Sequence, residues 1–169
     1  MDPAPPAEKP SRVLFVCMGN ICRSPAAETI FREKARRAGL QESFPCDSAG
    51  TIDYHAGMRA DDRMRFAASQ RGYEIRSIAR PVIEEDLEHF DRIIAMDQDN
   101  LRFLRRLARR DGQADKLSLM CDYCRKQRAH EVPDPYYGGS HGFDTVLDLL
   151  EDACEGLLET LQHDGADPA

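Results

Sequence analysis

The sequence predicts an α/β fold in which a mainly parallel sheet carries helices on both faces. Short apolar runs alternate along the chain with segments of helical periodicity, and this alternation favours right-handed crossovers. The chain has 169 residues, which suits one domain, and 41% of them are hydrophobic, enough to form a core. We expect this domain at residues 12–163, with a disordered leader at 1–11 and a disordered tail at 164–169.

The N-terminal half is expected to hold two strands and two helices. Residues 12–17 form a continuous apolar run, which is typical of a strand buried on both faces. A helix should follow, with Ser24 as its N-cap and Gly39 at its end. Residues 43–48 favour a weak second strand. Apolar residues at helical spacing over 59–71 predict the second helix.

The C-terminal half repeats the alternation. Residues 91–96 predict another buried strand, 101–110 a strongly basic helix and 116–120 a short strand. From residue 142 onward, the apolar spacing predicts a long amphipathic helix. The segment 121–142 before it is polar, with Pro, Gly and Tyr, and a loop of that length in a compact domain is often functional.

Charge and composition exclude several classes of partner. The net charge is −7, which argues against nucleic acid or an anionic membrane surface. Apolar runs stay far below the roughly 18 residues that a membrane span needs. The first twelve residues lack the apolar core of a secretory signal, so the six cysteines favour a reduced, cytoplasmic protein over a disulfide framework.

The stretch VLFVCMGNICRSP, residues 13–25, carries the chemistry. A strand, a tight loop and a helix N-terminus together make an anion site, because loop N–H groups point inward and the helix dipole adds partial positive charge. The Gly-Lys-Ser/Thr ending of a nucleotide P-loop is absent. Gly19 allows the backbone to approach a ligand. We therefore predict a phosphate-binding loop with contacts from Met18, Gly19, Asn20, Ile21, Cys22 and Ser24.

The residue types around this loop predict attack of a thiolate on phosphorus. Cys17 lies at the mouth of the amide nest, where the N–H groups and the dipole favour the ionised sulfur. Arg23 offers a planar fork for two phosphate oxygens, and Ser24 can donate a hydrogen bond to the sulfur when it leaves. Asp134, held between two prolines, is the candidate general acid and base.

The motifs CMGNICRSP and DPYYGG resemble those of the low-molecular-weight protein tyrosine phosphatases, over residues from about 12 to 163. A lone C-x5-R is a weak signal, whereas C-x5-R-S-P after a first strand together with D-P-Y-Y is specific. DSAGT at 47–51, ARP at 79–81 and AMD at 95–97 look like further family landmarks.

This resemblance implies a three-layer sandwich with a four-stranded parallel sheet, and hydrolysis of phosphotyrosine in proteins or peptides without metal or cofactor. Inorganic phosphate, vanadate or arsenate would compete for the site. By the same match, Cys17 would be the nucleophile, Arg23 the phosphate clamp and Asp134 the acid and base.

Supporting residues are also implied by the resemblance. Asn20 matches the residue that holds the loop in shape, braced by Ser24 and Ser48. Ser77 stands where the family often has a histidine that supports this asparagine. Cys22 matches the cysteine that forms a reversible disulfide with the nucleophile under oxidation.

An aromatic wall is expected at the entrance of the site. Tyr54 lies in the segment that matches the variable entrance loop, where many members have tryptophan. Tyr136 and Tyr137 follow the candidate acid and could flank an aromatic ring.

Three other functions share some of these features. A thioredoxin-coupled arsenate reductase would need two cysteines after the third strand, where residues 95–100 contain none. A protein arginine phosphatase of the same family tends to have threonine in place of Ile21, and an apolar Ile21 favours a phenyl ring over a guanidinium. A non-catalytic phosphate-binding module is expected to have lost Cys17 or Asp134, and both are present.

The pair Cys121 and Cys124 has the spacing of a metal or redox site. A second such pair is absent, and His130 alone leaves a zinc site incomplete. We therefore expect no metal.

Overall fold

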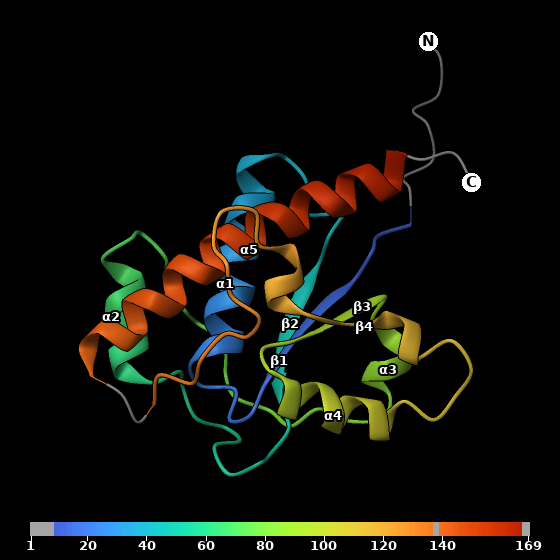
Figure 1. Ribbon diagram of the computed structural model, residues 1–169, viewed down its shortest axis with the longest axis horizontal. Coiled ribbons are helices and arrows are strands. Elements are labelled where there is room, and N and C mark those ends of the chain that lie inside the picture. The colour runs from blue at the N-terminus through green and yellow to red at the C-terminus, as the bar shows by residue number, and fades with distance from the viewer. Residues whose placement is uncertain (1–8, 137–138, 167–169) are drawn as a thin grey trace.

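The structure is a computed structural model that describes residues 9–136 and 139–166. Its sheet has four parallel strands in the order β2-β1-β3-β4 (Figure 1). The strands are β1 (Val13–Cys17), β2 (Cys46–Gly50), β3 (Arg92–Ala95) and β4 (Leu117–Leu119). The predicted α/β class and the four-stranded parallel sheet are therefore confirmed.

Helices cover both faces of this sheet (Figure 1). On one face α1 (Arg23–Arg37) packs against the long α5 (Ser140–Ala166), and α2 (Asp62–Ser69) lies beside them. On the other face lie the short α3 (Asp86–His89) and α4 (Gln98–Leu107). None of the helices in the described residues combines the length and the hydropathy that crossing a membrane requires.

Two hydrophobic cores, one on each face, explain the apolar run that starts the domain. Side chains of a strand alternate between the faces of the sheet. Val13, Phe15 and Cys17 accordingly belong to the core under α1 and α5. Leu14 and Val16 belong to the core under α4, and the whole of β1 is buried. Cys17 thus ends β1 on the face from which α1 starts.

Helix starts differ from the predictions because of their caps. Asp61 accepts two backbone N–H bonds at the start of α2, and the Asp97 side chain accepts one at the start of α4. These helices therefore begin at residues 62 and 98. The prediction that Ser24 caps α1 is wrong: Cys22 is the N-cap, and Ser24 lies inside the first turn.

Some boundaries and one element were missed. β2 begins at residue 46, three residues later than expected, and the four-residue helix α3 was not predicted. Helix α5 continues to residue 166, so residues 164–166 of the expected tail are helical. Residues 1–8 of the expected leader and 167–169 of the tail lie outside the described residues.

Glycine 156 fixes the distance between α5 and the turn after β4. A Cβ atom on Gly156 would lie 1.9 Å from the carbonyl oxygen of Tyr123. Glycine to alanine in a helix normally stabilises by about 0.5–1 kcal/mol. Here we expect Gly156→Ala to lower the free energy of unfolding by about 1–3 kcal/mol, because the overpacked helix must move.

Gly165 in the same helix is the matched control, since a Cβ atom there meets nothing within 4 Å. Gly165→Ala should leave the protein equally or slightly more stable. Urea unfolding of both variants measures the difference, and equal effects would show that the Tyr123 contact does not limit the packing.

Candidate active site

The loop between β1 and α1 lies at the C-terminal edge of the parallel sheet, where ligands of such folds bind. It starts at Cys17 and ends where α1 begins, at Arg23. Asn20 has a φ angle of 57°, in the left-handed region that asparagine tolerates better than most residues. Gly50, at the end of β2, backs the loop: a Cβ there would lie 2.8 Å from the Met18 carbonyl oxygen. The ends of β1 and β2 therefore both shape the tight turn of this loop.

Hydrogen-bonding groups surround the sulfur of Cys17, whose residue is only 2% exposed. The Asn20 backbone N–H donates to Sγ at 3.3 Å, and the Ser24 hydroxyl lies 3.0 Å from Sγ. The N-terminus of α1 points its partial positive charge to the same place. These groups can stabilise negative charge on the sulfur.

Asn20 holds the loop through both ends of its side chain. Its Nδ2 donates to Ser24 Oγ at 2.7 Å, as expected, and its Oδ1 accepts from the backbone N–H of Arg80 at 3.0 Å. The expected brace from Ser48 is not formed. The Ser48 hydroxyl instead donates to the buried carboxylate of Glu28 at 2.6 Å.

Arg80 supports Asn20, whereas Ser77, which stands where the family often has a supporting histidine, does not. The Ser77 hydroxyl is buried and finds no hydrogen-bond partner among the described residues. The Arg80 guanidinium binds Asp47 and Asp86, each at 3.0 Å, and so fixes the main chain that reaches Asn20. The Ala-Arg-Pro landmark in the sequence was the signal for this role.

Arg23 is a buried cation between two carboxylates. Its Nη1 donates to Asp97 Oδ2 at 2.6 Å and to the Val132 carbonyl at 3.0 Å. Its Nη2 lies 3.6 Å from Asp134 Oδ2. Burial by itself would lower the pKa of Arg23, but Cys17, Asp97 and Asp134 outweigh it and raise this pKa. The guanidinium is therefore always charged. The sequence alone predicts no role for Asp97.

Asp134 faces Cys17 across one cavity of about 370 Å³. The backbone N–H of Tyr136 donates to its Oδ1 at 3.0 Å, which leaves Oδ2 directed to Arg23. Asn20 and Ser24, which were predicted as phosphate contacts, do not line this cavity. The cavity is lined by Cys17, Met18, Gly19, Ile21, Cys22, Arg23, Ile52, Tyr54, His55, Asp134 and Tyr136.

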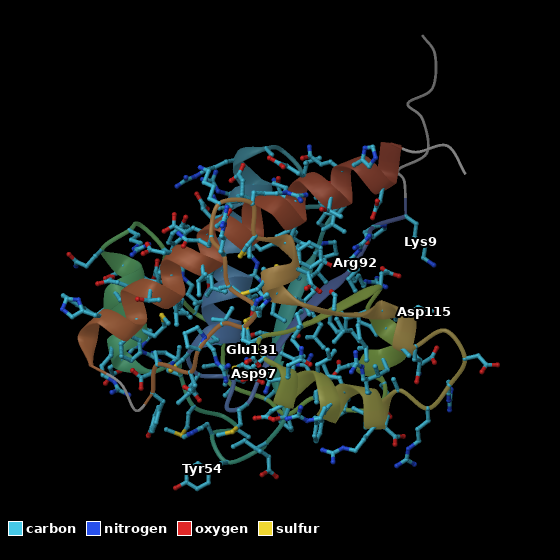
Figure 2. All side chains as sticks on the ribbon, viewed as in Figure 1. Lys9, Tyr54, Arg92, Asp97, Asp115 and Glu131 are labelled. Carbon is cyan, nitrogen blue, oxygen red and sulfur yellow. The ribbon has the colours of Figure 1, made fainter. Side chains whose placement is uncertain are left out.

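Aromatic rings form the mouth of this cavity. Tyr54 is 81% exposed and projects outward at the lower edge of the molecule, whereas Asp97 lies inward at the start of α4 (Figure 2). The ring of His55 packs against Tyr54 at 4.9 Å and lies over Gly19. It also faces Tyr136 at 6.3 Å between centroids. His55 was not predicted, and Tyr137 lies outside the described residues.

Arg63 links the phosphate loop to the opposite wall. Its guanidinium stacks 5.2 Å from the Tyr136 ring and 4.9 Å from the Phe143 ring of α5. It also binds the Asp61 carboxylate at 2.9 Å, while the Asp61 backbone N–H donates to the Ile21 carbonyl. The start of α2 therefore ties the loop and the Tyr136 wall together.

Cys22 lies next to the nucleophile candidate but has different chemistry. Burial, followed by the charges of Asp61 and Cys17, raises the pKa of the Cys22 thiol far above its usual value. Cys22 is therefore a neutral thiol at neutral pH.

No group of three or more His, Cys, Asp or Glu side chains among the described residues is arranged so that it could hold a metal ion.

We expect Asp97→Asn to lower kcat/KM about tenfold, because a charged hydrogen bond that orients Arg23 is worth roughly 1.5–3 kcal/mol. Asparagine still accepts the hydrogen bond that caps α4, so the fold should persist. Asp99→Asn is the control, since Asp99 is exposed and pairs with Arg102. Equal kinetics of the two variants with phenyl phosphate would contradict the orienting role.

Comparisons with known proteins agree with this geometry. Residues 12–167 match the family described as low molecular weight phosphotyrosine protein phosphatase. A Streptomyces coelicolor protein named low molecular weight protein-tyrosine-phosphatase is 41% identical over 154 residues, which are 90% of this chain and 94% of the relative.

Solved structures of two kinds of phosphatase share this fold. A protein tyrosine phosphatase from Entamoeba histolytica, with Hepes in its active site, superposes with a TM-score of 0.89 at 47% identity, covering 92% of this chain and 99% of the other. A Drosophila arginine phosphatase superposes with a TM-score of 0.83 at 31% identity, covering 92% and 99%.

Proposed function

The chain belongs to the low molecular weight phosphotyrosine protein phosphatase family, and we propose that Cys17, Arg23 and Asp134 carry out its reaction. The protein is accordingly a protein tyrosine phosphatase that acts on phosphoproteins. This assignment rests on one observation. Cys17 and Asp134 line the same cavity, and the Arg23 guanidinium lies between them.

In the first step the phosphate group lies in the amide nest of residues 18–23, with Arg23 binding its oxygens. Cys17 Sγ attacks phosphorus in line, so that the S–P bond forms while the bond to the tyrosyl oxygen breaks. Asp134 gives its proton to that oxygen, which leaves as a neutral phenol. Phosphate in the nest replaces Asp134 as the partner of Arg23 Nη2.

In the second step water attacks the phosphocysteine. Asp134, now ionised, takes a proton from this water as the P–O bond forms and the S–P bond breaks. The Ser24 hydroxyl, 3.0 Å from Sγ, stabilises the leaving thiolate. Arg23 stabilises the charge that develops on phosphorus in both steps.

The walls of the cavity favour an aromatic ester. Ile21 and Ile52 give it an apolar lining, and Tyr136 gives it one aromatic side. Tyr54 extends the wall at the mouth. We propose phosphotyrosine proteins or peptides as substrates, with inorganic phosphate, vanadate and arsenate as competing ligands. We also place the protein in the cytoplasm, because a reducing compartment keeps Cys17 as an active thiol.

The structural similarity to an arginine phosphatase makes phosphoarginine the second candidate substrate. Ile21 argues against it, since a guanidinium leaving group would need polar partners where this side chain lies. The decisive experiment compares phosphotyrosine and phosphoarginine peptides of one sequence, with a chelator present and no added metal.

We expect kcat/KM to be at least about tenfold higher for the phosphotyrosine peptide than for the phosphoarginine peptide. Ile21→Thr should reduce the free-energy difference that corresponds to this preference by about 1–3 kcal/mol. Preference for phosphoarginine in the wild type would move the protein to the second candidate. Turnover that requires added metal would contradict the mechanism itself.

We further propose that Cys22 protects Cys17 from irreversible oxidation. Peroxide converts Cys17 to a sulfenic acid, and the neighbouring Cys22 thiol then forms an S–S bond as water leaves. Wild type inactivated by peroxide should therefore recover most of its activity with dithiothreitol, whereas Cys22→Ala should recover only a small part. Equal recovery would remove this role from Cys22.

A further inference from the structure

A second pair of cysteines lies on the turn that follows β4. Cys121 is inside the 3₁₀ turn Met120–Tyr123, and Cys124 is its C-cap. Residues i and i+3 eclipse each other in this helix, and a rise of about 2.0 Å per residue puts their Cα atoms about 6 Å apart. Disulfides need a Cα separation of about 4.4–6.8 Å. The backbone therefore already has disulfide-compatible geometry.

Hydrogen bonds on both sides hold this turn in place. The Cys124 backbone N–H donates to the Cys121 carbonyl at 3.2 Å. The Leu119 N–H donates to Asp122 Oδ2 at 3.1 Å. The Asp152 carboxylate of α5 accepts from the backbone N–H groups of residues 125–127. Both cysteines consequently stay adjacent in the reduced protein, which gives one thiol a high effective concentration at the other.

The environment of the two thiols differs from that of Cys17. Cys121 is 7% exposed, whereas Cys124 is half-buried and reachable from solvent. Burial is the main cause that raises the pKa of both thiols, to about 12 for Cys124, whose thiol donates a hydrogen bond to the Leu149 carbonyl at 3.9 Å. Such thiols react slowly. Because their thiolates are not stabilised, a disulfide between them resists reduction once it is formed.

We propose that Cys121 and Cys124 form a second reversible disulfide, separate from the Cys17 and Cys22 pair. With hydrogen peroxide as oxidant, one sulfur attacks a peroxide oxygen, the O–O bond breaks, and a sulfenic acid and water result. The second thiol attacks that sulfur, the S–S bond forms, the S–O bond breaks, and a second water leaves. Two thiols are oxidised and one peroxide is reduced.

The disulfide would close the turn from which the segment with Val132 and Asp134 departs. The pair does not line the cavity that holds Cys17. We therefore expect the reduced double variant Cys121→Ser/Cys124→Ser to keep its turnover within about twofold of wild type, since it leaves the phosphate loop untouched.

Trypsin separates the two pairs, which makes the test direct. Leu117–Arg125 carries Cys121 and Cys124 alone, and Val13–Arg23 carries Cys17 and Cys22 alone. The native protein is treated with peroxide, free thiols are alkylated, the protein is digested with trypsin, and the peptide masses are measured by mass spectrometry. We expect Leu117–Arg125 to lose two hydrogen atoms and to regain them with dithiothreitol. Cys46 and Cys154 serve as single-thiol references.

Rate and pH give a second readout. The Leu117–Arg125 disulfide should form more slowly than that of Val13–Arg23, and about tenfold faster for each unit of pH, because the thiolate fraction rises tenfold per unit below the pKa. The proposal fails if Leu117–Arg125 stays a dithiol in native protein at pH 9 while the same peptide is oxidised in urea. It also fails if the only product is a sulfinic acid or a link between two molecules.

Discussion

Cys17→Ser is expected to reduce kcat by about 10⁴-fold or more, while inorganic phosphate still binds. A serine hydroxyl is a far weaker nucleophile than a thiolate, because it keeps its proton at neutral pH. In the proposed mechanism, phosphate is bound by Arg23 and by loop N–H groups, which this substitution leaves in place. Residual turnover and phosphate binding by calorimetry measure the two halves of the prediction.

Cys46→Ser is the matched control, because Cys46 lies at the start of β2 and its thiol contacts the Glu28 carbonyl. It should keep wild-type turnover. If Cys17→Ser retains more than about 1% of kcat, then Cys17 is not the nucleophile. If the variant loses phosphate binding together with activity, the substitution has disturbed the loop rather than the chemistry.

Asp134→Asn is expected to lower kcat for phenyl phosphate by about 10²–10⁴-fold, the usual contribution of a general acid. For p-nitrophenyl phosphate the loss should be much smaller, since a stable phenolate leaves without a proton.

Glu131→Gln is the control for Asp134, since Glu131 lies on the same segment and accepts from the Gln98 backbone N–H at 2.6 Å. Any effect of Glu131→Gln on kcat should be the same for phenyl phosphate and p-nitrophenyl phosphate. An equal loss for both esters in Asp134→Asn would show that Asp134 positions the loop or Arg23 instead of transferring a proton.

The parts of the fold and site that depend on local sequence could be predicted. The apolar run ending at Cys17 is continuous because β1 is buried on both faces. The loop up to Arg23 follows from residues adjacent in the chain, and Asp134 stands out between its prolines. Each of these signals is contained in fewer than about a dozen residues, so periodicity and motif spacing suffice.

The contacts that complete the site join distant parts of the chain. Asp97 lies 74 residues from Arg23, and Arg80 lies 60 residues from Asn20. The landmarks ARP and AMD mark Arg80 and Asp97 in the sequence, but they do not show which distant residue each one contacts. His55 could not be placed either, because its position over Gly19 depends on how the entrance segment folds back. Ser48 failed as a brace since Glu28, from the facing helix, takes its hydroxyl.

The hydrogen bonds that shape the phosphate loop are made within the protein, through Asn20, Ser24 and Arg80. A ligand therefore does not spend binding energy on ordering this loop. We expect such a site to accept the released phosphate almost as readily as the ester, because both present the same oxygens to the loop. Inorganic phosphate should then act as a product inhibitor, so that its concentration in the surroundings sets the fraction of enzyme that is free to bind the next substrate.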